Sequence, residues 1–326
     1  MNRQPNFSTL SAYLAEKIPL KDLSPQQAVK NSIFITARYR TGSTYLYSLF
    51  SSLANTATFY EPLNYHLVDN LDKDEQQTQQ DKSQFAHTLK EGYLADYQSL
   101  DRNNLIKYFR REFNLTNIVM SATEQNDELK EYIHFLLSTY PQKLKVLQFN
   151  RIDFRLPWFK INFPQTFIVN LRRNPRDIYA SFVGMFLRKT SEKPQVNLEE
   201  GVETMIDYVG LNEELDALST VFALQSITDR LNSYQKVYLL NQLSNRWADS
   251  FADLVVEYES LIEDPMAAID EILSYLPTWE LSFDREFIEA KKNRINVWQE
   301  YHADSWFKNN EIVCNELIEQ LFSKSA

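Results

Sequence analysis

The chain has 326 residues, of which 44% are hydrophobic and 24% are charged, a composition typical of folded globular proteins and unlike that of disordered or fibrous ones. Its 34 Lys and Arg against 44 Asp and Glu give a net charge of −10, which argues against a general nucleic-acid binder or a polybasic protein of the membrane surface. The single cysteine, Cys314, excludes an internal disulfide and a cysteine-cluster metal site, and the four histidines are too scattered to form a metal motif.

Five short runs rich in β-branched and aromatic residues predict β-strands. They are Ser32–Ala37, Thr56–Tyr60, Lys145–Phe149, Thr166–Leu171 and Asp253–Tyr258. The intervening segments carry apolar residues at helical spacing, mainly over residues 43–53, 85–140, 175–187 and 198–250, and from 265 to the end with a break near Pro277. Strands that alternate with helices predict an α/β fold with a mainly parallel sheet flanked by helices.

The domain organisation is expected to be simple. No linker rich in Pro, Gly or Ser divides the chain, so we expect a single domain over residues 1–326. The helical stretches at about 64–140 and 186–250 are predicted to be insertions on its core, and the polar residues 72–84 a solvated loop or lid. No apolar run approaches the roughly 20 residues that span a bilayer, and the N-terminus has no signal-peptide pattern, so we expect a cytoplasmic protein without a transmembrane segment.

The first predicted strand leads into Arg40-Thr41-Gly42-Ser43-Thr44 and then into a helix. Glycine permits a tight turn in which successive backbone N–H groups and the positive N-terminus of the helix can hold a phosphate. Ser43 and Thr44 add hydroxyl donors, and Arg40 adds a cation. The segment is not a Walker A loop, because the spacing is too short and the Gly-Lys-Ser/Thr ending is missing. The alternative is an ordinary turn in which Ser43 or Thr44 caps the helix.

A second constellation follows the fourth predicted strand. Arg173 lies at the end of that strand and Ser181 near the second turn of the next helix, where both can bind another phosphate. Asn174 is expected to cap this helix, with Pro175 at its first position and Asp177 at its third.

The two loops together are rich in arginine for a chain of net negative charge. Their arginines are Arg38, Arg40, Arg172, Arg173 and Arg176. The alternative to phosphate binding is that these arginines are solvated or paired with neighbouring acids such as Asp177, and for Arg176 we favour that alternative.

Three segments resemble the motifs of sulfotransferases that use 3′-phosphoadenosine 5′-phosphosulfate (PAPS). Tyr39–Leu46 (YRTGSTYL) is similar to the 5′-phosphosulfate loop of that family, and Arg172–Ser181 (RRNPRDIYAS) to its 3′-phosphate motif. Val256–Pro265 (VEYESLIEDP) resembles the segment that follows a late strand. The motifs occur in the family's order, each after a predicted strand, and together they are specific. The resemblance is nearest to the carbohydrate and bacterial branches, where a Glu-Pro pair follows the second strand as Glu61-Pro62 does here.

The resemblance implies a P-loop-like fold and the transfer of a sulfuryl group from PAPS to a hydroxyl or, in second place, an amine. The acceptor can be a carbohydrate or a glycolipid. It also assigns residues to the cofactor site: Arg40, Thr41, Gly42, Ser43, Thr44, Tyr45, Arg173, Ser181 and Tyr258. No metal is expected, because the sulfuryl group carries less charge than a phosphoryl group and needs no divalent clamp. The glycine-rich C-terminal cofactor motif of the phenol and steroid branch is missing, so the adenine site is not assigned from that region.

Three residues are candidates for catalysis. Arg40 can stabilise the charge on the leaving phosphate. Glu61 is the expected base, since Pro62 fixes it at the end of a strand and its aromatic neighbours can desolvate it and raise its pKa. The alternative for Glu61 is a salt bridge to a loop arginine. His66 is the second candidate base, with a pKa suited to the work, and Tyr258 can instead be a buried tyrosine of the core.

Two other classes of function stay open at this stage. A nucleotide-dependent kinase on a related phosphate-loop fold would require Mg²⁺, ATP and a Walker lysine, which the loop lacks. A non-catalytic relative that binds nucleotide or glycan would retain the site without turnover. The acceptor and the oligomeric state are not determined by the sequence.

Overall fold

The computed structural model describes residues 31–71, 94–189, 197–221, 230–277 and 295–323. These residues fall into two compact units. We call them the sheet unit, within Pro25–Arg172 and Phe251–Lys292, and the helical unit, within Arg173–Ser250 and Asn293–Ala326. The single-domain organisation stays a prediction. The loop or lid predicted at 72–84 lies outside the described residues.

The sheet unit is built on five parallel strands in the order β2-β3-β1-β4-β5. Their bounds are β1 (Ser32–Ala37), β2 (Thr56–Tyr60), β3 (Leu144–Phe149), β4 (Thr166–Arg172) and β5 (Leu254–Glu257). The predicted parallel sheet is therefore confirmed, and the predicted strands agree with the observed ones to within one residue at either end. One difference is Tyr258, which was expected to end the last strand and instead begins a helix.

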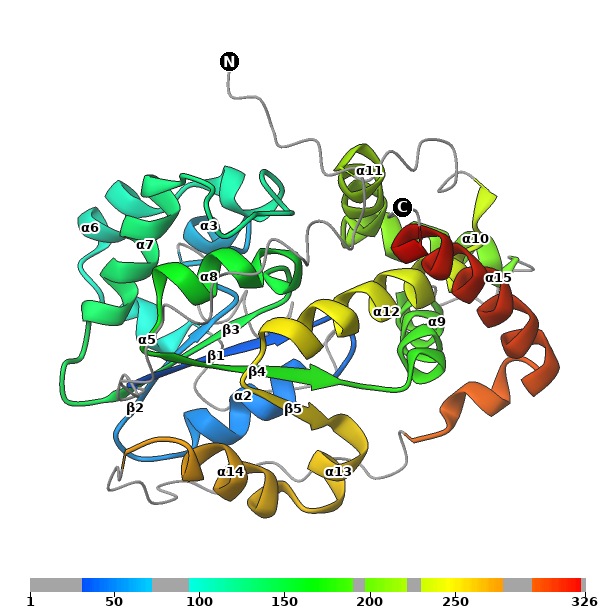
Figure 1. Ribbon diagram of the computed structural model, residues 1–326. Coiled ribbons are helices and arrows are strands. Elements are labelled where there is room, and N and C mark those ends of the chain that lie inside the picture. The colour runs from blue at the N-terminus through cyan, green and yellow to red at the C-terminus, as the bar shows by residue number, and fades with distance from the viewer. Residues whose placement is uncertain (1–30, 72–93, 190–196, 222–229, 278–294, 324–326) are drawn as a thin grey trace. The chain divides into compact units, whose positions relative to one another are not determined.

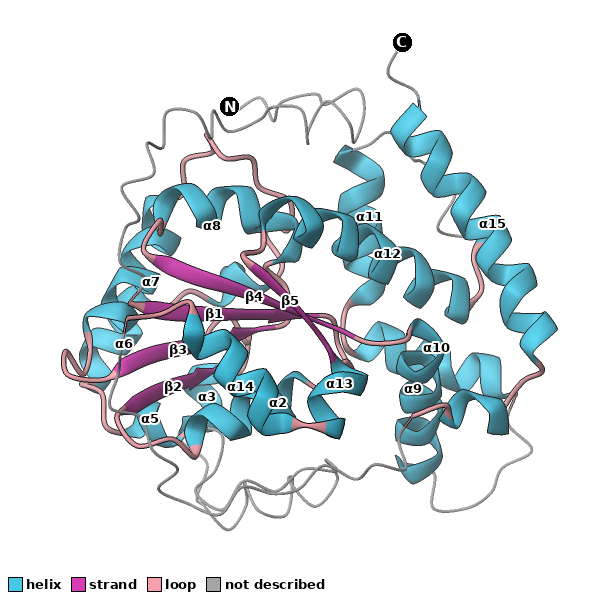
Figure 2. Cartoon of the chain, turned by 60° about the horizontal axis from the view of Figure 1, so that its bottom comes forward, coloured by secondary structure: helices cyan, strands magenta, loops and turns pink. Residues whose placement is uncertain are grey.

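The helices of the sheet unit lie on both faces of the sheet (Figures 1 and 2). They are α2 (Ser43–Ser51), α3 (Leu67–Leu71), α5 (Ala95–Gln98), α6 (Arg102–Tyr108), α7 (Asp127–Ser138), α8 (Leu156–Asn162), α13 (Tyr258–Glu263) and α14 (Pro265–Ser274), with 3₁₀ turns η1 (Arg111–Asn114) and η2 (Asp153–Arg155). The stretch expected to be mostly helical over 85–140 thus contains short helices separated by turns in its described part. Asp264 caps α14 by accepting the N–H of Ala267 at 3.0 Å.

Alternation along the strands gives the sheet two apolar faces. Ile33 and Ile35 of β1 belong to a cluster with residues of α2, α13 and α14. Phe34 points to the other face, where its ring packs edge-on against Phe159 of α8 at 5.6 Å and against Phe149 at 5.4 Å. The sheet is therefore the buried middle layer of three, which leaves its strand ends as the places where polar groups can gather.

The helical unit contains five described helices and one 3₁₀ turn. They are α9 (Pro175–Lys189), α10 (Leu198–Tyr208), α11 (Leu211–Val221), α12 (Ser233–Phe251), α15 (Asp304–Ser323) and η5 (Val297–Glu300). Rings of Tyr179, Tyr234 and Phe307, from α9, α12 and α15, pack against one another with centroids 4.8–6.2 Å apart. Asn174 accepts the N–H of Arg176 at 3.0 Å and Pro175 is the first residue of α9, as the sequence predicts.

Candidate functional site

The turn between β1 and α2 is held in an unusual backbone conformation. Arg40 and Gly42 both have positive φ, 68° and 99°. Gly42 is the N-cap of α2, the place expected for Ser43 or Thr44, because only glycine adopts this conformation at low cost. A side chain at Gly42 would also collide with the ring of Tyr258, which is buried against the turn. The hydroxyl of Thr41 donates to the carbonyl of Arg38 at 2.7 Å and so closes the turn.

The first turn of α2 presents polar groups toward the ends of neighbouring strands. The N–H groups of Ser43 and Thr44 lie where a helix provides no acceptors of its own and where its dipole is positive. The Thr44 hydroxyl lies 2.9 Å from the hydroxyl of Tyr60. Tyr45 has another use: its N–H donates to the Gly42 carbonyl at 2.9 Å and its ring is buried in the apolar cluster. Anion binding in this turn would therefore involve the N–H groups of Ser43 and Thr44.

Glu61 directly follows β2 and is fixed through both backbone and side chain. Its N–H donates to the carbonyl of Gln148 in β3 at 2.9 Å, and its φ of 44° is in the left-handed region. One carboxylate oxygen accepts a hydrogen bond from the Asn64 amide at 2.8 Å, and the other accepts one from the Asn150 amide. Backbone strain of this kind persists only where the surroundings hold it, and it is common at functional sites.

Asn150 links Glu61 to the turn at Gly42. It is the first residue after β3, and its amide donates to Glu61. Its carbonyl oxygen accepts hydrogen bonds from the Gln148 amide at 2.9 Å and from the Ser43 hydroxyl at 3.4 Å. Glu61, Gly42 and Ser43 were predicted from the sequence, whereas Asn150 and Gln148 were not. The signal that could have found Asn150 is its place directly after a predicted strand of a parallel sheet.

The environment of Glu61 favours its protonated form. Burial raises the pKa of Glu61 above 4.5, while hydrogen bonds from Asn64, Tyr60 and Asn150 and the positive charge of Arg151 oppose that rise. The direction agrees with the expectation that this carboxyl is desolvated. The alternative expected for Glu61 was a salt bridge to a loop arginine, but the two groups bonded to its oxygens at Asn64 and Asn150 are neutral amides.

Two arginines near the turn have defined partners. Arg38 and Asp153 form a buried ion pair with a 2.9 Å contact, their side chains 6% and 2% exposed. Arg151 donates to the Asn114 side chain at 2.7 Å, and its guanidinium lies 5.1 Å from the centre of the Tyr39 ring. Arg38 is therefore part of the folded core of the loop, and Arg40 is the cation that lies within the turn itself.

His66, the second candidate base, is in a different setting. Its side chain is 65% exposed, and its Nδ1 lies 3.5 Å from Asp69, which also binds Arg111 through two contacts. The backbone N–H of His66 donates to the Asn64 side chain at 2.8 Å. Asn64 thus binds both the Glu61 carboxylate and the backbone of His66, and the two candidate bases differ in burial: Glu61 is desolvated and the His66 side chain is exposed.

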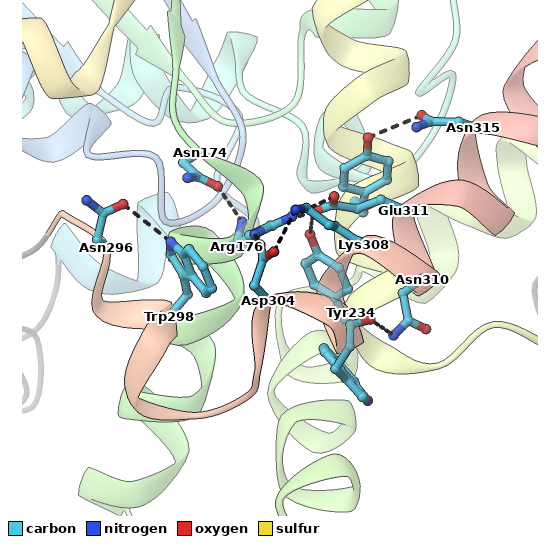
Figure 3. A network of polar contacts seen from close by, with 12 residues as sticks. Asn174, Arg176, Tyr234, Asn296, Trp298, Asp304, Lys308, Asn310, Glu311 and Asn315 are labelled. Carbon is cyan, nitrogen blue, oxygen red and sulfur yellow. Dashed lines mark hydrogen bonds and ion pairs between the residues drawn. The ribbon is translucent and has the colours of Figure 1, made fainter.

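The predicted 3′-phosphate residues lie in the helical unit. Arg173 is buried in the short connection between β4 and α9, and Ser181 is half-buried in the second turn of that helix. Arg176 is ion-paired, as favoured from the sequence, but the expected partner Asp177 is wrong. Arg176 binds Glu311 at 2.6 Å and Asp304 at 2.6 Å (Figure 3). The carboxylate of Asp177 instead accepts the backbone N–H groups of Asn296 and Trp298. The reason is that α15, remote in sequence, supplies acids facing α9.

Within the described ranges, no helix is long and apolar enough to cross a membrane. In the same part of the chain, His, Cys, Asp and Glu side chains form no group of three or more that could hold a metal ion.

The chain is similar to known proteins in sequence and in structure. The sequence model of the sulfotransferase family matches residues 32–280. Among solved structures, a sulfotransferase from Alicyclobacillus acidocaldarius is 15% identical, covering 88% of this chain and 95% of that one, with a TM-score of 0.41. The sulfotransferase domain of the Synechococcus PCC 7002 olefin synthase is 18% identical over 90% and 97%, with a TM-score of 0.44. A retinol dehydratase in complex with retinol and PAP is 13% identical over 96% and 86%, with a TM-score of 0.37. No curated protein matches the chain.

Proposed function

The chain belongs to the sulfotransferase family, and we propose that it transfers a sulfuryl group from PAPS to a hydroxyl, or in second place an amine, by in-line displacement. One observation carries the proposal: the desolvated carboxyl of Glu61 is joined through Asn150 to Ser43, in the first turn of the helix that follows Gly42. A base for the acceptor and N–H donors for the leaving phosphate thus occur at one edge of the sheet, as an in-line transfer requires.

On the donor side, the turn provides charge stabilisation. The N–H groups of Ser43 and Thr44 and the positive end of α2 favour an anion, and Arg40 adds a full charge to the same turn. The oxygen of the 5′-phosphate gains negative charge as its bond to sulfur breaks. Groups that hold this charge act most strongly in the transition state, so they accelerate transfer as well as bind the donor.

On the acceptor side, Glu61 is the proposed base. As the acceptor oxygen bonds to sulfur, its proton passes to a carboxylate oxygen of Glu61, the bond from sulfur to the phosphate oxygen breaks, and 3′-phosphoadenosine 5′-phosphate leaves. The raised pKa of Glu61 brings it closer to neutral pH, where a base is most effective. Activity is therefore expected to rise with pH along a limb that lies above 4.5. His66 is the second candidate for this role.

The cofactor is tested by nucleotide binding. We propose Arg173 and Ser181 for the 3′-phosphate and Tyr258 for contact with the adenine, as the family resemblance implies. In a thermal-shift assay, 3′,5′-bisphosphoadenosine at a hundredfold excess over its Kd should stabilise the folded protein by about 2.7 kcal/mol. We expect 5′-AMP to stabilise it much less, and Arg173→Ala to remove the difference. Equal stabilisation of the parent protein by both nucleotides would count against these 3′-phosphate residues.

Two variants separate the roles of Arg40 and Glu61. Arg40→Ala should weaken binding of the bisphosphate and slow transfer. Glu61→Gln should leave nucleotide affinity nearly unchanged and lower turnover roughly 10²–10⁴-fold, the usual contribution of a positioned base. The assay is [³⁵S]PAPS turnover with a panel of sugars, glycolipids, phenols, aliphatic alcohols and amines. Normal turnover by Glu61→Gln would show that Glu61 is not the base and would leave His66 as the next candidate.

The same assay discriminates the other classes of function. We expect turnover to survive a chelator of divalent cations, since the sulfuryl group needs no metal clamp. Transfer of phosphate from [γ-³²P]ATP to the same acceptors, dependent on Mg²⁺, would favour a kinase. Bisphosphate binding without turnover of PAPS with any acceptor would favour a non-catalytic relative.

A further inference from the structure

Asn150 lies where three parts of the sheet unit meet. It follows β3, its amide donates to the Glu61 carboxylate after β2, and its carbonyl oxygen accepts from Ser43 at the start of α2. The orientation of the Asn150 amide is determined by these partners. An ionised carboxylate only accepts, so the Asn150 nitrogen faces Glu61, and its oxygen faces the Ser43 hydroxyl and the Gln148 amide.

The backbone around Glu61 restricts the carboxylate in the same way. Tyr60 pairs with Gln148 in the parallel ladder of β2 and β3, and the next N–H, that of Glu61, donates to the Gln148 carbonyl at 2.9 Å. The ladder thus fixes the main chain of Glu61 against β3. Asn150, two residues beyond Gln148, then fixes the side chain against the same strand.

We propose that Asn150 is a positioning residue for sulfuryl transfer, holding the Glu61 carboxylate in register with the first turn of α2. The inference rests on the proposed function, and it adds a residue that acts through Glu61 rather than on the donor or the acceptor. Its physical basis is that a base must be placed to within a few tenths of an ångström of the proton it accepts.

The hydrogen bonds to Glu61 leave the carboxylate able to act. An ionised carboxylate has about four lone-pair sites, of which the amides of Asn64 and Asn150 use one on each oxygen and Tyr60 uses a third. The remaining site can accept the proton of the acceptor hydroxyl. Because both amides only donate, they hold the carboxylate in place without supplying a proton that would compete with the acceptor's.

The pH dependence gives the proposal a distinctive signature. The groups that face Glu61 are Tyr60 beside it on β2, Arg151 after β3, Asn64 and Asn150, and Glu61 in turn acts on buried Tyr97 of α5. The hydrogen bond from Asn150 favours the ionised carboxylate and so lowers its pKa. Asn150→Ala removes that contribution, and Asn150→Asp replaces the donor with a second acid. Both variants should raise the pKa of Glu61, and the aspartate should raise it further.

The test compares Asn150→Ala and Asn150→Asp with the parent protein and with Asn162→Ala. Asn162 is a matched control in the sheet unit, since its amide donates to the Trp158 carbonyl of its own helix at 3.0 Å. [³⁵S]PAPS turnover is measured from pH 5 to 9, with the acceptor that the panel above provides. In parallel, the δ-carbon resonance of Glu61 is titrated in protein labelled with [δ-¹³C]glutamate, assigned by its loss in Glu61→Gln, which needs no acceptor.

We expect Asn150→Ala to lower kcat at neutral pH roughly ten- to a hundredfold, the worth of a hydrogen bond to a charged group. The acidic limb of the pH–rate profile and the titration midpoint of the Glu61 resonance should both move to higher pH, in the order parent, Asn150→Ala, Asn150→Asp. Bisphosphate affinity should be unchanged, and Asn162→Ala should behave as the parent. In the Glu61→Gln background, Asn150→Ala should cost no further activity, because the two residues act as one unit.

Other results overturn the inference. An unshifted acidic limb and Glu61 resonance in both variants would show that Asn150 does not position the carboxylate. Additive losses in the double variant would show that Asn150 acts independently of Glu61. Should Asn150→Ala fail to fold, the isosteric Asn150→Asp carries the test alone. A parent protein that turns over no PAPS refutes the proposed function, and the positioning role with it, whereas an active parent with unaffected variants refutes only the inference.

Discussion

Gly42→Ala is predicted to be among the most damaging single-methyl additions in the described part of the chain. Two features of the structure act on it together. Gly42 has a φ of 99°, and its missing β-carbon would fall on the ring of Tyr258, which is 5% exposed. Because the ring is buried in the apolar cluster, it has little room to retreat.

The size of the effect follows from these two terms. A left-handed residue with a β-carbon costs about 1–2 kcal/mol, and an overpacked core about 1–3 kcal/mol, so we expect Gly42→Ala to lower the free energy of unfolding by about 2–5 kcal/mol. Two other glycines separate the terms. Gly201→Ala, inside α10, meets the ring of Phe186 without a positive φ; it should lose about 0–2.5 kcal/mol, since overpacking costs about 1–3 kcal/mol and alanine in a helix gains about 0.5–1 kcal/mol. Gly184→Ala, inside α9 and 3.5 Å from the flexible end of Arg188, should gain about 0.5–1 kcal/mol.

The assay is urea-induced unfolding of the three variants and the parent, followed by circular dichroism, with bisphosphate affinity measured on each folded protein. Gly42→Ala should also lose affinity, because the strain falls on the turn proposed to hold the 5′-phosphate. A Gly42→Ala protein as stable as the parent would refute the reasoning about the turn. A loss equal to that of Gly201→Ala would show that the ring contact acts alone and that the positive φ costs nothing.

Three further predictions concern the framework. Burial would raise the pKa of Glu311, but the hydrogen bonds led by the one from Arg176 outweigh burial and hold that pKa below 4.5. Ionised Glu311 therefore stabilises the fold at pH above 4.5, and this stabilisation is lost as the pH falls through the lowered pKa. In urea unfolding, the loss of stability at acidic pH should accordingly be smaller in Glu311→Gln than in the parent. Asp153→Ala should cost about 3–5 kcal/mol in the same measurement, because it removes the carboxylate of a buried ion pair while the charge of Arg38 stays buried. Replacing the pair by Met and Leu should recover most of the loss. Cys314 is fully buried and burial raises its pKa to about 12, so a thiol reagent should modify it only as fast as the protein opens, and rapid reaction with the folded protein would contradict its placement.

The strands were predictable because their signals are local. Each of β1, β2 and β4 is a run of five to seven residues in which β-branched and aromatic side chains dominate, and because both faces of the sheet are covered these runs are buried almost throughout. The cap of α9 at Asn174 and Pro175 is equally local. Tyr258 was misassigned because a buried tyrosine suits a strand end and a helix start equally well.

The helix start at Gly42 was less predictable, although the turn itself was recognised. Ser43 is a good cap by its side chain, and the sequence alone favours it. In the structure the Ser43 hydroxyl donates to Asn150 instead, and glycine takes the cap position with a φ of 99°. The choice is decided by Asn150 and Tyr258, which are more than a hundred residues away. Local capping preference therefore yields to tertiary contacts at this turn.

The partners of Glu61 depend on strand order, which the sequence pattern alone does not determine. Glu61 and Asn150 are 89 residues apart and are joined only because β2 lies beside β3. In a parallel sheet, the first residue after each strand falls on one edge, and neighbouring strands place these residues within hydrogen-bonding reach. Given the order β2-β3-β1, the sequence would have placed Asn150 between Glu61 and the turn at Gly42 without any side-chain coordinates. The order of the strands is therefore the single piece of information that converts a correct prediction of strands into a prediction of this site.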